Sequence, residues 1–220
     1  MSERENILDR VREALRAEAY APSGTGLPTT VERRRVMPAV GATFDERVAL
    51  FAKNAGDLTA TFRVLRDAGE LTAELGVLRD TGGWQRVAAH RGDLAGDAAR
   101  SLGLPILFTD DGYDKNELEQ CDVGISECDA LVAQTGTVVV TSRSAGGRAL
   151  SCLPPHHVVI ARREQLVADL PAAFLLIARK HGADYPSMIS FITGPSRTAD
   201  IERTLVLGAH GPRRLTIFVL

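Results

Sequence analysis

Four short runs rich in β-branched and aromatic residues constrain the fold of this chain most strongly. The runs read TVVVT, HVVIA, MISFI and LTIFV, and they occupy residues 137–141, 157–161, 188–192 and 215–219. Such residues pack well on a pleated sheet, so each run is predicted to be a strand. A helix is expected between the second and third runs, over about residues 163–180.

Helical and strand-like patterns also alternate through the first half of the chain. Helical spacing of apolar residues predicts helices over 44–55, 68–78 and 96–102, and strands are expected at 58–64, 84–89, 105–108 and 122–126. Alternation of this kind favours a mostly parallel sheet covered by helices. The expected fold class is α/β, a three-layer α/β/α sandwich.

The N-terminal segment differs from the rest. Ile7, Leu8, Val11 and Leu15 recur at helical spacing between charged residues, which predicts an amphipathic helix within residues 1–20. Residues 21–41 are rich in Pro, Gly and Thr and are expected to form an extended connector. The α/β domain is therefore expected to span residues 42–220.

Composition narrows the class of protein. The chain is 45% hydrophobic and 25% charged with a formal net charge of −2, which is typical of a soluble globular protein and gives no general attraction to nucleic acid. With no apolar run near the roughly 20 residues that cross a bilayer, and no apolar stretch at the N-terminus, we expect no membrane span and a cytoplasmic location. Three cysteines without a C-x-x-C pair signal neither a disulfide framework nor a metal site, so free thiols are expected.

Common catalytic and cofactor motifs are missing from the sequence. It has no P-loop, no G-x-G-x-x-G, no H-E-x-x-H and no G-x-S-x-G. We therefore expect no cofactor and no metal, and disfavour nucleotidases, dehydrogenases, zinc proteases and α/β-hydrolases. Any chemistry is expected to come from scattered loop residues.

The segment DALVAQTGT, residues 129–137, ends where a strand is predicted to begin. Gly136 would permit close backbone approach, and the hydroxyls of Thr135 and Thr137 could bind a ligand oxygen. Asp129 and Gln134 belong to the same candidate site. The alternative is an ordinary turn between a helix and a strand.

The next loop, TSRSAGGRALS, holds two Arg and three Ser residues with a glycine pair. Guanidinium groups, hydroxyls and free backbone N–H groups suit a carboxylate or phosphate, so Arg148 and Ser151 are candidate ligand-binding residues. The alternative is a flexible hairpin tip. His156 and His157 follow, and because neighbours in an extended segment point to opposite faces, only one of them, taken here as His157, is expected to face the site.

The last candidate loops lie in ITGPSRTADIERTLVLGAHGP, residues 192–212. Hydroxyls, a guanidinium and an imidazole are more than turns alone require, so ligand contacts are expected from Gly194, Ser196, Arg197, Thr198, Asp200 and His210. The alternative is a short helix capped by Ser196 or Thr198, with Asp200 and Glu202 in its first turn.

Three segments together resemble the lactate-utilisation protein C family, whose members consist of a LUD domain. They are GISECDALVAQTGTVVV, GRALSCLPPHHVVIA and FITGPSRTADIERTLVLGAHGPRRLTIFVL, and the resemblance extends over nearly the whole chain. It implies a NagB/RpiA/CoA-transferase-like fold and a role in oxidising L-lactate to pyruvate beside iron-sulfur partner proteins. The residues that carry the motifs are Asp129, Thr135, Gly136, Thr137, Gly147, Arg148, Ser151, Pro154, Gly194, Pro195, Ser196, Asp200, Glu202, Gly208, His210, Gly211 and Pro212.

One position departs from that family pattern. Many relatives carry Glu where this chain has Gln134, and an amide cannot act as a carboxylate nucleophile or base. Transferase chemistry through that position is therefore not expected. The sequence leads to three hypotheses: a non-redox subunit of L-lactate oxidation that binds a small anionic or nucleotide-like ligand, an independent transferase, isomerase or ligase, or an assembly factor for the iron-sulfur proteins.

Overall fold

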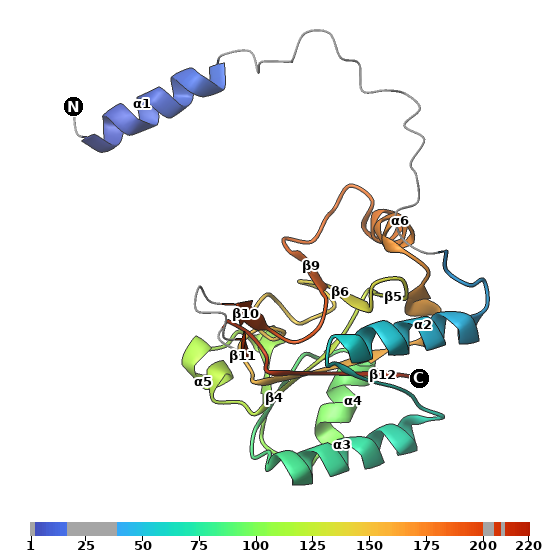
Figure 1. Ribbon diagram of the computed structural model, residues 1–220. Helices are drawn as coiled ribbons and strands as arrows, with labels where there is room; N and C mark the ends of the chain where they lie inside the picture. The colour runs from blue at the N-terminus through green and yellow to red at the C-terminus, as the bar shows by residue number, and fades with distance from the viewer. Residues whose placement is uncertain (1–2, 17–38, 200–204, 208–209) are drawn as a thin grey trace. The chain divides into compact units, whose positions relative to one another are not determined.

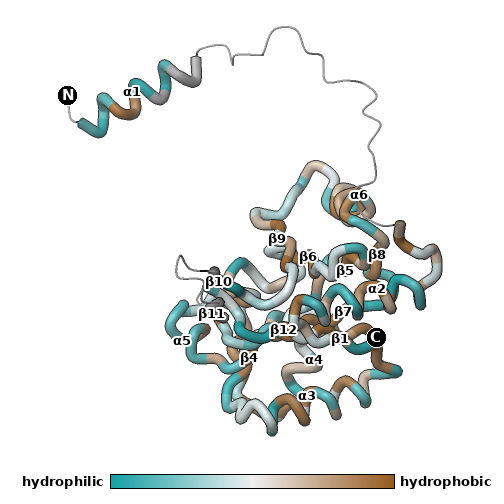
Figure 2. The backbone as a smooth tube through the Cα atoms, viewed as in Figure 1, coloured by the Kyte–Doolittle hydropathy of each residue, from teal (hydrophilic) through white to brown (hydrophobic). Residues whose placement is uncertain are grey.

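The computed structural model describes residues 3–16, 39–199, 205–207 and 210–220. Helix α1 (Glu3–Arg16) belongs to a compact unit of its own, Met1–Val36. This helix lies within the segment where the sequence predicts an amphipathic helix. Hydrophobic and hydrophilic positions alternate along it (Figure 2), and Ile7 and Leu8 are 56% and 39% exposed. The predicted connector, residues 21–41, falls mostly outside the described residues and stays a prediction.

A six-stranded parallel sheet forms the centre of the second unit, Met37–Leu220 (Figure 1). Its order is β1-β12-β7-β4-β2-β3, and every neighbouring pair is parallel. The α/β class and the mostly parallel sheet are thus confirmed, whereas the likeness to the NagB group stays a prediction. The strands are β1 (Thr61–Val64), β12 (Arg214–Val219), β7 (His156–Ala161), β4 (Val123–Glu127), β2 (Val87–Ala89) and β3 (Ile106–Phe108).

Helices cover both faces of this sheet. On one face lie α3 (Ala68–Gly82) and α4 (Asp93–Ser101), whose apolar residues pack against Val158, Ile160 and Phe218. On the other face lies α2 (Phe44–Asp57). It packs against the strand residues that alternate with these and point to the opposite side of the sheet. A capping box fixes its start, since Thr43 and Glu46 each accept a backbone N–H from the other. The short α5 (Lys115–Glu119) is mostly hydrophilic (Figure 2), and its Leu118 is buried in a small apolar cluster.

A second, four-stranded sheet lies between the main sheet and the last helix. Its order is β8-β5-β6-β9, formed by β8 (Leu166–Val167), β5 (Ala130–Val132), β6 (Thr137–Thr141) and β9 (Ile189–Ile192). One face packs on the main core and the other on α6 (Leu170–His181). This sheet is the part of the architecture that the sequence did not predict.

Two predicted elements differ here. The helix expected from residue 163 begins only at Leu170, where Asp169 caps it by accepting from the Ala172 N–H at 3.0 Å. The turn at Gly136 joins two antiparallel strands, so the helix-to-strand alternative is wrong. Gly136 has φ +65°, which a glycine adopts without strain.

The segment after β9 is a strand rather than a helix. Residues Arg197–Ala199 form β10, which pairs antiparallel with β11 (Leu205–Leu207). The alternative of a helix capped by Ser196 or Thr198 is therefore wrong, because the backbone of this segment bonds across to β-branched and aliphatic residues. Asp200, Glu202 and Gly208 lie outside the described residues. Of the helices that the structure describes, none has the length and apolar character to cross a bilayer.

Candidate functional site

A polar cleft lies where several strands of the main sheet end. His90 follows β2, Asp110 follows β3, Glu127 ends β4 and Arg162 follows β7. In open α/β sheets, ligands bind outside the carboxyl ends of the strands. The cavity here measures about 530 Å³, within the range of about 300–1,000 Å³ that small-molecule sites occupy. We call it the carboxyl-end cleft; it is lined by His90, Arg91, Gly92, Asp93, Asp110, Glu127, Cys128, Arg143, Ser144, Arg162, Gln165 and Lys180.

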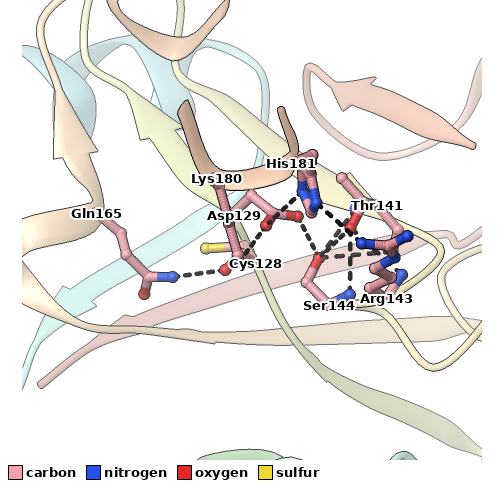
Figure 3. A network of polar contacts seen from close by, with 8 residues as sticks. All are labelled: Cys128, Asp129, Thr141, Arg143, Ser144, Gln165, Lys180 and His181. Carbon is pink, nitrogen blue, oxygen red and sulfur yellow. Dashed lines mark hydrogen bonds and ion pairs between the residues drawn. The ribbon is translucent and has the colours of Figure 1, made fainter. Parts of the chain in front are cut away.

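A buried carboxylate stands behind the cleft. Asp129, at the entry to β5, is 2% exposed. Its two oxygens accept from Lys180 Nζ at 2.5 Å and from Ser144 Oγ at 2.6 Å, and Figure 3 shows both side chains directed at it. Burial alone raises the pKa of Asp129, but the bonds from Lys180 and Ser144 outweigh it, so this pKa lies below its ordinary value. Asp129 is thus a carboxylate that holds an ammonium group at the cleft.

Basic side chains converge on the cleft from different elements. Lys180 lies in the last turn of α6 and its side chain is 50% exposed. Arg143, in the loop after β6, donates to Asp184 at 2.7 Å and to His181 Nδ1 at 3.4 Å. Arg162 lies 3.9 Å from Asp93. These cations are held by acidic or imidazole partners and remain partly exposed. They can therefore also form ion pairs with an anionic ligand.

Glu127 and His90 both line the cleft, and the Glu127 carboxylate and the His90 ring lie close together beside Gly92. One oxygen of Glu127 accepts from the N–H groups of Leu94 and Ala95, at 2.9 and 3.3 Å, and so caps α4 from a neighbouring strand. The Glu127 N–H donates to His90 Nε2 at 3.1 Å, which leaves the ring hydrogen of neutral His90 on Nδ1. Burial lowers the pKa of His90 despite the opposing charges of Glu127 and Asp110. The pair can exchange protons with a bound molecule.

Gly92 makes room for this pair. A Cβ built at Gly92 would collide with the Glu127 carboxylate and the His90 ring. No group of three or more His, Cys, Asp or Glu in the part of the chain that the structure describes is arranged to hold a metal ion.

The predicted site residues divide into separate places. Asp129 belongs to the carboxyl-end cleft. Five others line a smaller cavity at the opposite, amino end of β7 and β12: Ser151, His157, Gly194, Ser196 and His210. The structure therefore brings together residues from three of the predicted loops.

The remaining predicted residues contact other parts of the protein. Thr137 Oγ1 lies 2.7 Å from Thr135 Oγ1 and 2.8 Å from Thr193 Oγ1. A Cβ on Gly136 would lie 2.8 Å from the backbone nitrogen of Ala55, so this glycine serves close packing on α2. The Gln134 backbone carbonyl accepts from Asn54 Nδ2 at 3.0 Å.

The two predicted guanidinium groups bond to backbone carbonyls. Arg148 donates to Ser187 O at 3.0 Å, and Arg197 donates to Leu58 O and to Thr59 Oγ1. Neither lines either cavity. The backbone of Thr198 is in β10, its side chain is not among the described ones, and Asp200 lies outside the described residues.

Sequence reasoning missed most of the cleft. His90, Glu127, Arg162 and Lys180 were not candidates, although the first three occur at or just after predicted strands. Polar residues at strand ends were the available signal. The loop over residues 141–151 was a candidate oxyanion site, with Arg148 and Ser151 as its predicted ligand-binding residues. The structure instead brings Arg143 and Ser144 of this loop to the cleft.

Comparison with known proteins identifies the family of this chain. The profile of the LUD domain matches residues 1–220. The chain belongs to the LUD domain family. The resemblance found in the sequence is thereby confirmed, and among the relatives of this LUD protein is Lactate utilization protein C of Bacillus subtilis, 41% identical over 119 residues, 51% of this chain and 49% of that protein.

Two further relatives have the same name. Those of Geobacillus kaustophilus and Oceanobacillus iheyensis are 41% and 39% identical over 104 residues, 46% of this chain and 43% and 45% of theirs. The matched segment spans about half the length of these curated relatives. A crystal structure of a DUF162 family protein from Deinococcus radiodurans is 22% identical, with a TM-score of 0.61 over 81% of this chain and 99% of that one, and it supports the fold.

Proposed function

We propose that this LUD protein is a non-redox component of lactate utilisation that binds a small anionic or nucleotide-like ligand in the carboxyl-end cleft. The single observation that carries the ligand is the buried Asp129 carboxylate, which fixes Lys180 at the cleft beside Arg143 and Arg162. The lactate role rests on the relatives named Lactate utilization protein C. The non-redox role rests on the missing dinucleotide and C-x-x-C motifs of the sequence.

Calorimetric titration tests the ligand. The wild-type chain would be titrated with L-lactate, pyruvate, inorganic phosphate, ATP and CoA, together with Lys180→Met and Arg143→Gln. The matched control is Lys53→Met, because Lys53 also pairs with an acidic residue on a helix but is 70% exposed and lies outside the cleft. At least one anion is expected to bind, and about 10-fold more weakly to both cleft variants. An anion that binds equally to all four proteins, or no binding at all, contradicts the cleft proposal.

Growth tests the lactate role separately. A strain without the gene is expected to fail on L-lactate and to grow normally on other carbon sources. Restored growth with the wild-type gene but not with Arg143→Gln would join the two parts of the proposal. Unchanged growth of the deletion strain would remove the lactate role while leaving ligand binding open to its own test.

A second function, an isomerase or transferase acting on an acyl or phosphorylated substrate, is favoured by Glu127 and His90. The Glu127 carboxylate and the His90 ring both lie next to Gly92 in the cleft, and such a pair is suited to moving protons. Exchange of the pyruvate methyl protons with deuterated water, followed by NMR, is a sensitive assay of such chemistry. Exchange that disappears in Glu127→Gln but persists in Lys53→Met would support an enzyme.

The exposed apolar side chains of α1 support a partner. Ile7 and Leu8 would be buried if the helix docked on an iron-sulfur protein of the same system. Removal of residues 1–20 is then expected to abolish co-purification with such partners without changing the unfolding of the rest of the chain. Co-purification that survives this truncation rejects docking through α1.

A further inference from the structure

A second cavity lies at the amino ends of β7 and β12, whereas the cleft lies at the carboxyl ends of the main-sheet strands. We call it the amino-end cavity. Its volume is about 160 Å³, and it is lined by segments that are far apart in the sequence. His157 and Leu215 come from the strands themselves, Ser151 precedes β7, and Ser196 and His210 come from the loops around the β10–β11 hairpin.

Backbone contacts hold the cavity wall in place. The Ser196 N–H donates to Pro212 O at 2.9 Å, which ties two lining loops together. A Cβ on Gly211 would lie 3.1 Å from Ser196 Cβ, so the absence of a side chain at Gly211 permits this approach. Gly194 has φ +87° and packs against Leu58. The wall is therefore set by the fold before any ligand arrives.

His157 carries an unmet hydrogen-bonding atom. Its side chain is 1% exposed, and its Nε2 lies 2.8 Å from the buried Ser126 Oγ. Its Nδ1 is buried and has no hydrogen-bond partner among the described residues. His157 therefore contributes a buried ring to the wall of the cavity.

The described lining of the cavity is uncharged apart from any charge on its histidines. Among the described residues, no Asp, Glu, Lys or Arg lines it. Burial, and to a lesser extent the neighbouring His156, lowers the pKa of His157 to about 3, so its ring is neutral near pH 7. Hydroxyls of Ser151, Ser190 and Ser196 supply polar contacts, whereas Ile192 and Leu215 supply apolar surface. The lining thus differs in kind from that of the carboxyl-end cleft.

The volume limits the ligand. Cavities of about 150 Å³ hold molecules the size of benzene, or about six non-hydrogen atoms. We propose that the amino-end cavity is a second binding site, for a small uncharged molecule with one hydrogen-bonding group toward the hydroxyls of Ser151, Ser190 and Ser196 and a short apolar body against Ile192 and Leu215. This site is independent of the anion proposed for the carboxyl-end cleft.

Matched pairs of small molecules test the proposal. Lactamide and isobutyramide are neutral, and L-lactate and isobutyrate are carboxylates of nearly the same shape. The full chain, labelled with ¹⁵N, would be titrated with each while the ring nitrogens of His157 are followed by NMR. At least one amide is expected to shift the His157 signals and to slow alkylation of Cys152, an exposed thiol in the lining. Its carboxylate counterpart is expected to do neither.

Two leucine variants separate the cavity from the rest of the surface. Ser190→Leu fills the cavity from β9 and is expected to abolish both effects. Ser101→Leu makes the same change at an exposed position of α4 and should leave them intact. The proposal is overturned if neither amide acts, if the carboxylates act equally, or if the effects persist in Ser190→Leu. Lys180→Met should not alter them, which keeps this test distinct from that of the cleft.

Discussion

Lys180 Nζ lies 2.5 Å from Asp129 Oδ1, and this contact joins the last turn of α6 to the entry of β5 across 51 residues of sequence. The carboxylate side chain is fully buried, whereas the lysine side chain is half exposed. The buried partner therefore fixes the position of a charge that solvent and ligands can still reach. The Lys180–Asp129 pair is therefore expected to contribute both to ligand binding in the cleft and to the stability of the fold.

Removal of the lysine is expected to destabilise the fold. Lys180→Met leaves the buried Asp129 carboxylate without its ammonium partner, and loss of a hydrogen bond to a charged group costs about 1.5–3 kcal/mol. Urea unfolding measures the loss. Asp129→Asn in the same chain should recover part of it, because the uncompensated charge is gone. Lys53→Met, at an exposed pair, should change the free energy of unfolding by less than about 1 kcal/mol; an equal loss in both lysine variants would contradict this account.

Stability is expected to fall between about pH 6.5 and pH 4. Burial lowers the pKa of His156 to about 4 and that of His157 to about 3. Because the unfolded histidines titrate near 6.5, the unfolded state binds more protons below that pH, and stability is lost as the pH falls.

The expected slope is about 1.4 kcal/mol per pH unit for each histidine that is protonated only when unfolded. Urea unfolding at pH 7 and pH 5 measures the difference. The difference should shrink in His157→Gln. A wild-type stability that does not change between these pH values would reject the prediction.

Substitution of Gly92 is expected to damage the cleft. In Gly92→Ala the new methyl group collides with the Glu127 carboxylate and the His90 ring, and overpacking of this kind costs about 1–3 kcal/mol. The comparison variant is Gly76→Ala, inside α3, where nothing lies within 4 Å of the added atom. It should stabilise the helix by about 0.5–1 kcal/mol. Thermal unfolding of both variants tests this prediction. A Gly92→Ala protein as stable as the wild type would contradict it.

One of the three thiols is expected to react in the folded protein. Cys152 is exposed, whereas burial raises the pKa of Cys121 and of Cys128 and keeps both as thiols. Iodoacetamide should therefore modify one cysteine per native chain, and mass spectrometry should locate it at residue 152. In urea all three should react. Rapid native modification of Cys121 or Cys128 would contradict this prediction.

The main sheet was predictable because its strands have sequences that few other structures favour. The runs HVVIA and LTIFV are rich in β-branched and aromatic residues and agree with β7 and β12 of this sheet, and TVVVT agrees with β6 of the second sheet. The short β5 was missed because Ala-Leu-Val has no strand-specific composition. The start of α6 was misplaced because Asp169, its capping residue, lies inside a longer stretch of helical periodicity.

The candidate site was harder to predict, since it depends on contacts between distant residues. Asp129 was expected to bind a ligand, but its partner Lys180 lies on a helix that carried no motif. Glu127 and His90 meet only because β4 and β2 are neighbours in the sheet. Ser196 and Pro212, in contrast, come together across a hairpin whose loops were already suspected. Motifs located the loops, and strand order decided which side chains share a cavity.

The loop after β6 runs from the carboxyl ends of the main-sheet strands to their amino ends. Arg143 and Ser144 reach the cleft at the carboxyl ends, whereas Ser151 and Cys152 reach the cavity at the amino ends. A single short loop thus contributes both to the charged cleft and to the cavity whose described lining has no Asp, Glu, Lys or Arg. The cleft and the cavity therefore share one segment of wall, and an insertion or deletion between Ser144 and Ser151 is expected to act on both.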